Sequence, residues 1–534
     1  MPLSSLPAIA QQTPQPLRYD VRQFGARGDG STLDTEAINQ AIAAAAAAGG
    51  GTVYFPAGQY LSFSVRLQSR IVLHLDAGAT LVGADPAVHG GAYDAAEANP
   101  WDMYQDFGHS HWHNSLIWGE NLVDIGITGR GRIHGKGLTH SGPGPRRPGK
   151  AGDMPLSLRG ADPHGENAAG KEYGADMKGK GNKAIALRGC RNVLLRDFSI
   201  LNGGHFALLA TGVDNLTIDN LAVDTDRDGF DIDCCRNVRI ANCVVNSPND
   251  DAICLKSSYA LGAPRFTENV TITNCQVSGF DLGTFLDGSY QRTQQKAPDQ
   301  DGVTGRIKLG TESNGGFRNI TISNCVFERC RGLAIETVDG GVIEDITVDN
   351  LSMRDLTSAP LFVRLGRRMR APEGTPVGAI RRINISNVVV SNADARFASS
   401  VSGIPGHPVE DVRISNLHVV HQGGGTRADA ERAIPENEAS YPDPSMFGVT
   451  SAHGLFVRHV ANFELHHANF VYTRPDLRPA LVLHGVDGAV IERVRAQRVE
   501  NNALLELREV SGLELKDVAG MPDLKRARVA RQNI

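Results

Sequence analysis

A short phrase recurs along most of this chain and sets the main constraint on its fold. Most copies begin with Asn or Asp, continue with alternating apolar and polar residues, and then start again, usually from a second Asn. Copies begin at Asn192, Asn215, Asn237, Asn269, Asn319, Asp345, Ile383 and Asp411, with weaker ones at Asn462 and Ala489. Where no insertion intervenes, the starts lie about 22 to 30 residues apart, which is the spacing of a solenoid repeat.

The repeated phrase predicts an all-β fold. Its period-2 alternation and its β-branched residues indicate short strands. A repeat this short cannot bury its own apolar side, whereas stacked repeats form one continuous core. We therefore expect a right-handed parallel β-helix, a solenoid in which each coil contributes short strands joined by turns.

An N-terminal helix is expected to cap this solenoid. Asp34 is a candidate N-cap, the Ala-rich stretch over residues 35–48 favours a helix, and Gly49 ends it. Such a helix would cover the open edge of the first coil, which otherwise invites pairing with another strand. No linker divides the chain, so residues 18–534 are expected to form one domain. Long polar loops are expected at 140–182, 280–304 and 421–450, where they would shape a binding cleft.

The N-terminal residues 1–17 read as the remainder of an export signal. They lack the basic start and the full apolar core of an intact signal peptide, but the segment AIA resembles its small-x-small end. We therefore predict a periplasmic or secreted protein with a truncated signal; a disordered tail is the alternative. No apolar run reaches about 18 residues, so no transmembrane helix and no membrane partner are expected. The net charge of −5 argues against a nucleic-acid partner.

The eight cysteines fit neither a disulfide framework nor a zinc site. Cys243, Cys275 and Cys325 occupy the same position in three copies of the repeat. We expect them to be small buried residues that stack from coil to coil.

Two groups of carboxylates stand in residues 224–258, separated by an apolar strand. The first contains Asp226, Asp228, Asp231 and Asp233, and the second is the pair Asp250–Asp251. Because the groups lie about one repeat apart, stacking of the coils would bring them to one face. Cleavage of a glycosidic bond needs such a pair, namely an acid and a base that activates water.

This region and three further segments resemble the polygalacturonases, family 28 of the glycoside hydrolases. The segments are FGARGDGSTLDTEAINQAI, GGGTVYFPAGQY and ITGRGRIHGKG, and the resemblance runs from about Tyr19 to about Glu500. The family pattern is N-T-D-G-x-D, then D-D about 20 residues later, then G-H-G and R-I-K. The resemblance implies that Asp250 is the general acid and that Asp228 and Asp251 hold and deprotonate the attacking water. It also implies an inverting, cofactor-free enzyme, whose carboxyl groups would lie about 6.5–9.5 Å apart.

Several positions depart from that pattern. The first motif reads Asp226-Arg227-Asp228, where the family has Asn and Thr before the aspartate. Thr304 stands roughly where the family has its histidine. Ala334 and Glu336 replace the Arg and Lys that bind the sugar carboxylate in the family. Arg306 and Lys308 are candidates to supply that positive charge; otherwise the sugar in this subsite is neutral.

Four further side chains are candidates for substrate binding. They are Asp231, on the same strand as Asp228; His205, one coil earlier; Glu336; and Trp112, from a segment in which tryptophans and histidines interleave and an aromatic cleft wall is plausible. Each has a structural alternative, such as a turn, a core position or an ion pair. We expect no metal at the histidines of this segment, because no spaced cysteine or acidic ligand set accompanies them.

The sequence thus predicts an inverting glycoside hydrolase that acts on pectin-type, galacturonate-containing saccharides, and the long loops favour exo action. Three alternatives stay open: a hydrolase of neutral-sugar glycans, a polysaccharide lyase on the same scaffold, and a non-catalytic carbohydrate-binding β-helix. The oligomeric state is not predicted.

Overall fold

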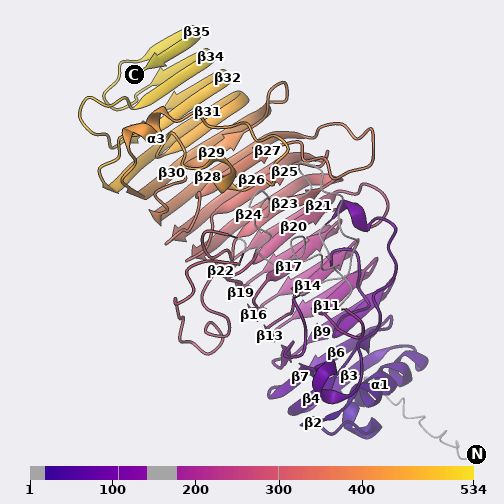
Figure 1. Ribbon diagram of the computed structural model, residues 1–534. Helices are drawn as coiled ribbons and strands as arrows, with labels where there is room; N and C mark the ends of the chain where they lie inside the picture. Colours follow the sequence, from indigo (N-terminus) through magenta and orange to yellow (C-terminus); the bar gives the residue numbers. More distant parts are fainter. Residues whose placement is uncertain (1–17, 106–107, 141–176, 299) are drawn as a thin grey trace, which may run out of the picture.

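The computed structural model describes residues 18–105, 108–140, 177–298 and 300–534, and these form one long solenoid of parallel strands (Figure 1). The coils rise from the N-terminal end to the C-terminal end, and neighbouring coils pair in register. For example, β14 (Phe206–Thr211) pairs with β17 (Asp228–Asp233), and β15 (Asp214–Asp219) pairs with β18 (Arg236–Ala241). The predicted parallel β-helix is confirmed. The expected tail, residues 1–17, and most of the expected loop 140–182 lie outside the described residues.

The strands form three stacks that run along the solenoid. The first stack contains β5 (Val65–Arg66), β8 (Ile117–Glu120), β11 (Lys183–Arg188), β14, β17, β20 (Ile253–Ser257), β23 (Ile307–Ser313), β25 (Leu333–Thr337), β27 (Leu361–Leu365) and β29 (Ser399–Ser402). The second contains β1 (Arg18–Asp20), β3 (Gly51–Phe55), β6 (Ile71–Leu75), β9 (Val123–Thr128), β12 (Arg191–Arg196), β15, β18, β21 (Thr267–Thr273), β24 (Gly316–Glu328), β26 (Val342–Arg354), β28 (Ala379–Ala393) and β30 (Val409–Gly423). The third contains β2 (Asp29–Leu33), β4 (Gly58–Ser62), β7 (Ala79–Gly83), β10 (Arg132–His134), β13 (Ser199–Leu201), β16 (Ala222–Asp224), β19 (Val244–Asn246) and β22 (Gln276–Ser278). The last coils are built by β31 (Leu455–Arg474), β32 (Leu481–Glu492), β33 (Arg495–Ala496), β34 (Leu505–Lys516) and β35 (Leu524–Asn533).

The asparagine that opens each repeat has two structural roles. Asn192, Asn215, Asn237, Asn269 and Asn319 all have φ between 54° and 58°, a left-handed conformation that Asn tolerates better than most residues. Their side chains also form a ladder, since the amide of Asn215 donates to Asn192 at 3.0 Å and that of Asn319 donates to Asn269 at 2.8 Å. The repeat is therefore visible in the sequence because each turn needs this residue.

The interior of the solenoid is a continuous apolar core. Buried Leu, Ile, Val and Phe side chains fill it from the first coil to the last. All eight cysteines are buried and free, as expected for stacked small residues. Among the described residues, no helix is long and apolar enough to cross a membrane.

Both ends of the solenoid are closed, but differently. Helix α1 (Thr35–Ala47) packs its Ala and Ile face on the first coil, which confirms the predicted cap. Asp34 stands at its N-cap position but does not cap it, because its carboxylate accepts the backbone N–H groups of Arg27 and Gly28 at 2.7 and 3.0 Å. At the other end, β35 pairs antiparallel with β34 and so reverses the direction of the stack.

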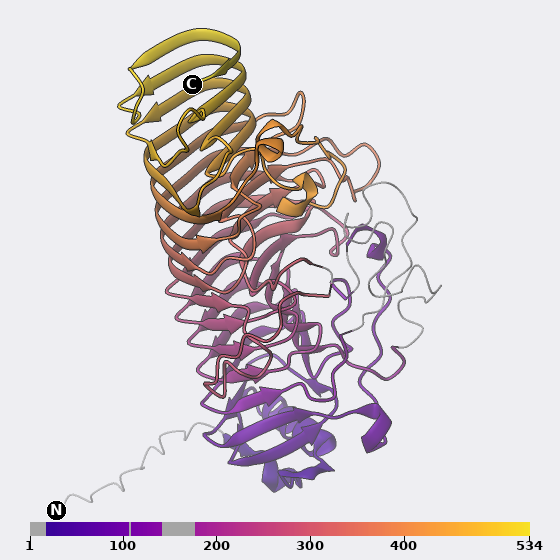
Figure 2. The same ribbon diagram turned by 60° about the vertical axis from the view of Figure 1, so that its left-hand side comes forward.

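The first stack differs from the second in what covers its outer face. Strands of the second stack alternate buried and exposed residues, whereas β14, β17, β20 and β23 are buried on both faces. Long connecting segments gather on one side of the solenoid and cover this face (Figure 2). One is residues 94–113, which include η2 (Asp102–Tyr104) and follow α2 (Pro86–His89); the other is residues 426–450, with α3 (Arg427–Glu431) and η4 (Pro444–Phe447).

Candidate active site

Three carboxyl groups meet where β17 and β20 lie side by side. Asp228 begins β17, and Asp250 and Asp251 immediately precede β20, which pairs with β17 in parallel register. One oxygen of each carboxyl lies within 4.8 Å of the others. A water molecule that makes hydrogen bonds of about 2.7 Å fits between two oxygens at such a distance.

Asp228 is the carboxyl of the three that favours the protonated form. Burial raises the pKa of Asp228 well above its ordinary value, and the charges of Asp231 and Asp250 raise it further. Lys256 opposes this, but its ammonium is 3.9 Å away. One buried oxygen of Asp228 has no hydrogen-bond partner among the described residues. Burial and the neighbouring like charges thus both disfavour a negative charge on Asp228.

Asp251 has the opposite environment. Burial alone would raise the pKa of Asp251, but Lys308 and Arg306 hold it well below its ordinary value. Lys308 Nζ and Arg306 Nε each lie 2.8 Å from a carboxylate oxygen of Asp251. These two cations, predicted to bind a sugar carboxylate, are therefore engaged by Asp251 in this structure. Lys308 also contacts the hydroxyl of Tyr441 at 3.2 Å.

Asp250 is the most exposed of the three carboxyl groups. Its side chain is 24% exposed, against 4% for Asp228 and Asp251. One oxygen lies 2.6 Å from the guanidinium of Arg227, and the other accepts the backbone N–H of Asp251 at 3.0 Å. Asp250 thus faces the space that a substrate can enter.

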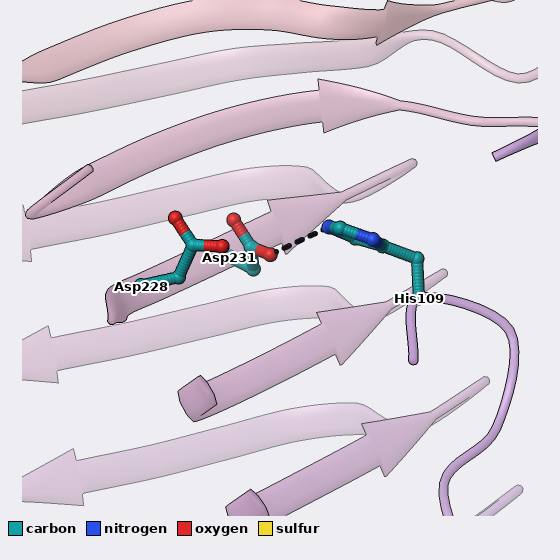
Figure 3. Close-up of side chains that lie close together, drawn as sticks. All are labelled: His109, Asp228 and Asp231. Carbon is teal, nitrogen blue, oxygen red and sulfur yellow. Dashed lines mark hydrogen bonds and ion pairs between the residues drawn. The ribbon is translucent and has the colours of Figure 1, made fainter. Parts of the chain in front are cut away.

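A buried cation, Lys256, lies beneath the carboxyl cluster. Its ammonium is 3.2 Å from Asp231 and 3.5 Å from Glu312, and it contacts the ring of His109. His109 in turn lies 2.9 Å from Asp231, as Figure 3 shows together with the neighbouring Asp228. Burial raises the pKa of Asp231, but Lys256 and His109 outweigh this and lower it.

Lys256 and His109 were not predicted as site residues from the sequence. The only signal for Lys256 was a lysine inside the apolar strand ICLKS, where a charged side chain needs a partner. His109 was singled out only as part of an aromatic segment. Its link to Asp231 joins residues 122 positions apart, which no local pattern indicates.

Two groups of donors in this site are spaced as metal ligands would be. They are His109 with Asp228 and Asp231, and Asp228 with Asp250 and Asp251. In both groups cationic side chains of the chain already balance the carboxylates, namely Lys256 in the first and Arg227, Arg306 and Lys308 in the second. We therefore assign no metal to either group.

Ala334 and Glu336, at the family's cation positions, both lie on β25 and are fully buried. Ala334 packs with Phe362, Met446 and Phe447, so residues 426–450 cover this position. Neither carboxyl oxygen of Glu336 has a hydrogen-bond partner among the described residues. Burial raises the pKa of Glu336 to about 7, against the opposing charges of Lys308 and Arg306.

Glu336 makes the stability of the protein depend on pH. An acid whose pKa is raised in the folded state stabilises the fold fully below its unfolded pKa, and this contribution is lost as the pH rises through the folded value. Replacing Glu336 with glutamine should therefore raise the free energy of unfolding above that of wild type at pH 8, by at most about 3 kcal/mol. At pH 4 the two proteins should be equally stable. Thermal unfolding of both proteins across this range measures the difference. Glu410→Gln, an exposed change on β30, is the control, and equal pH profiles for Glu336→Gln and wild type would refute the assignment.

The remaining candidates lie around the cluster. His205 is buried, its Nδ1 lies 2.5 Å from the carbonyl of His140, and burial lowers its pKa well below the ordinary value. Asp233 accepts hydrogen bonds from the backbone and hydroxyl of Ser258, as expected of a turn-binding residue. The expected sugar-stacking role of Trp112 does not fit the structure. Its ring is fully buried and its indole N–H donates to Thr211 at 3.0 Å, because residues 94–113 use it to anchor themselves to the solenoid.

Comparisons with known proteins agree with this architecture. A family model described as rhamnogalacturonase A/epimerase, pectate lyase-like, matches residues 19–91, and one described as a right handed beta helix region matches residues 171–292. A probable polygalacturonase of Vitis vinifera is 25% identical over 429 residues, which cover 74% of this chain and 73% of the relative. An exo-poly-alpha-D-galacturonosidase of Dickeya chrysanthemi is 24% identical over 386 residues, which cover 66% of this chain but only 58% of that enzyme.

A solved structure supports the fold over nearly the whole chain. The family 28 exopolygalacturonase of Yersinia enterocolitica aligns with 95% of this chain and 79% of its own, with a TM-score of 0.59 and 19% identity. The predicted resemblance is confirmed: the chain is a polygalacturonase-like protein of the parallel β-helix fold, and the relatives from Vitis vinifera and Dickeya chrysanthemi carry the names probable polygalacturonase and exo-poly-alpha-D-galacturonosidase.

Proposed function

We propose that this polygalacturonase-like protein is an inverting glycoside hydrolase that cleaves galacturonate-containing, pectin-type saccharides from a chain end. The observation that carries the proposal is the cluster of Asp228, Asp250 and Asp251, whose oxygens lie within 4.8 Å of one another in three different electrostatic environments. Different environments separate the carboxyl groups into acid and base roles. The names of the relatives from Vitis vinifera and Dickeya chrysanthemi support the choice of substrate.

Water attack on the anomeric carbon would be assisted by Asp228 and Asp251, while Asp250 protonates the leaving oxygen. Asp250 suits the acid role because it is the carboxyl open to the substrate. Asp251 is held ionised by two cations, which suits a group that orients water. The stereochemistry of the product is a direct test of these roles: proton NMR of the first product should detect inversion at the anomeric carbon, and retention would overturn this part of the proposal.

Exo action is supported by the segments that cover the first stack on both sides of the cluster. Residues 94–105 and 108–113 pack over β11 and β14 through Trp112, which lies in one apolar cluster with Ala186 and Phe206 of these strands. On the other side, residues 426–450 pack over β25, β27 and β31. Two buried arginines fasten this second segment: Arg364 donates to the carbonyl of Glu436 at 2.8 Å, and Arg458 donates to those of Ile434 and Pro435 at 2.9 Å. A polymer that lies along the outer face of the first stack would contact both covering segments. The end of a polymer chain would contact only one of them.

A neutral sugar is the second candidate substrate. It is favoured by the buried Ala334 and Glu336 at the family's cation positions and by the engagement of Arg306 and Lys308 with Asp251. An exported location, predicted from residues 1–17, stays a prediction.

Product release from a substrate panel tests the proposal. The panel contains polygalacturonate, rhamnogalacturonan and neutral plant glycans, each incubated with wild type and with Asp250→Asn. We expect monosaccharide or disaccharide from polygalacturonate with wild type and none with the variant. Release from neutral glycans alone would overturn the substrate, and a product that absorbs as an unsaturated uronate would favour a lyase. If wild type and the variant both bind a glycan and neither releases product, the protein would be a non-catalytic carbohydrate-binding β-helix.

A further inference from the structure

Arg227 is the feature of the site that the proposed mechanism leaves unused. It stands immediately before Asp228, and its guanidinium lies 2.6 Å from an oxygen of Asp250. A guanidinium at this distance makes a charge-assisted hydrogen bond to the carboxyl oxygen. A general acid must instead direct its carboxyl at the leaving oxygen. In the free protein, Arg227 therefore engages the group that is proposed as the acid.

Among the cations paired with the cluster, Arg227 is the most accessible to an incoming ligand. Its side chain is 13% exposed, whereas Lys256, Arg306 and Lys308 are 7%, 4% and 3% exposed. If Arg306 or Lys308 turned toward a sugar, the buried carboxylate of Asp251 would lose one of its two cationic partners, which would destabilise the protein. An acidic sugar that enters beside Asp250 thus meets Arg227 before any other cation of the cluster.

We infer that Arg227 exchanges Asp250 for the carboxylate of an acidic sugar in the substrate. The inference rests on the proposed function. It makes Arg227 a specificity-determining residue: an acidic sugar is recognised by releasing the catalytic acid as well as by binding. Among the described residues, the charged and titratable groups near Asp250 include Arg227, Asp228, Asp251 and Tyr441 from the covering segment.

The exchange breaks one ion pair and forms another. In the free protein the guanidinium of Arg227 is paired with Asp250. With an acidic sugar bound, the guanidinium is paired with the sugar carboxylate, and the carboxyl of Asp250 is released toward the leaving oxygen. When the acidic product leaves, Arg227 returns to Asp250 and the starting state is restored.

Trigalacturonate and its fully methyl-esterified form are the substrates that test this inference, because only the carboxylate charge differs. Wild type should prefer the acid by about 10- to 150-fold in kcat/KM, the range of a hydrogen bond to a charged group. Arg227→Gln should lose this factor on the acid but not on the ester, so that the preference disappears.

Two controls separate the possible outcomes. Arg227→Lys keeps the charge and should keep the preference for the acid, and Arg239→Gln, which removes an exposed arginine bonded to Thr217 on the outer face, should change neither rate. Equal losses on both substrates with Arg227→Gln would overturn the inference and leave the proposed function standing. If wild type cleaves neither galacturonate substrate, the proposed function itself fails.

Discussion

Replacing Asp228 with asparagine is expected to abolish hydrolysis while leaving the protein as stable as wild type or more stable. The loss follows from the role proposed for Asp228 as the base, and such groups contribute about 10²- to 10⁴-fold to kcat. The gain in stability follows from burial, because the carboxyl is almost inaccessible and asparagine cannot acquire the buried negative charge that Asp228 takes on at high pH.

The stabilising effect of Asp228→Asn should depend on pH. The pKa of Asp228 is raised in the folded state, so its contribution to stability is fully present below the unfolded value of about 3.9 and is lost as pH rises through the folded value. The two proteins should therefore have similar melting temperatures near pH 3.5 and differ most above neutrality. Thermal unfolding from pH 3.5 to pH 8 and kcat on polygalacturonate provide the two readouts. A variant that is both inactive and less stable at every pH would contradict this account.

Replacing Asp251 with asparagine should have the opposite effect on stability. Arg306 and Lys308 would both lose their nearest carboxylate while remaining buried. Breaking a buried ion pair from one side typically costs about 3–5 kcal/mol, so a clear fall in melting temperature is expected together with loss of activity. Glu336 should limit this fall, because its buried carboxyl lies near both cations and would ionise at a lower pH than in wild type.

A double-mutant cycle separates the ion pair from other effects of Asp251→Asn. Lys308→Met removes the other half of the pair, so the double variant should be more stable than the sum of the two single changes predicts. The free energy of unfolding of all four proteins in denaturant gives the coupling. If the two changes are simply additive, the ion pair of Asp251 and Lys308 does not stabilise the fold.

The fold was predictable from sequence because its cause is local and repeated. Asn215 and Asn237 recur at the same turn of successive coils, and the same left-handed conformation explains both. The meeting of Asp228 with Asp250 and Asp251 was predictable for the same reason, since one coil of spacing brings them together.

The partners of these carboxylates were not predictable, because they depend on how distant segments pack. His109 reaches Asp231 from a covering segment, and Trp112 from the same segment is buried, although tryptophan faces commonly bind sugars. Nothing in the sequence distinguishes an aromatic residue that anchors a segment from one that lines a cleft. The pairing of Arg306 and Lys308 with Asp251, rather than with solvent or a ligand, likewise required the register of β20 and β23.

The antiparallel strand β35 also has a consequence for how copies of this protein meet. A stack of parallel coils has no intrinsic end, so the open last coil of one molecule would match the open first coil of another and let molecules join head to tail into a fibre. Here α1 covers the first coil, and β35 adds to the last coils a strand that runs against the stack and carries the exposed residues Lys525, Arg526 and Arg528. Neither coil therefore offers the parallel edge that such a contact needs, and the charge on β35 repels its counterpart on a second copy.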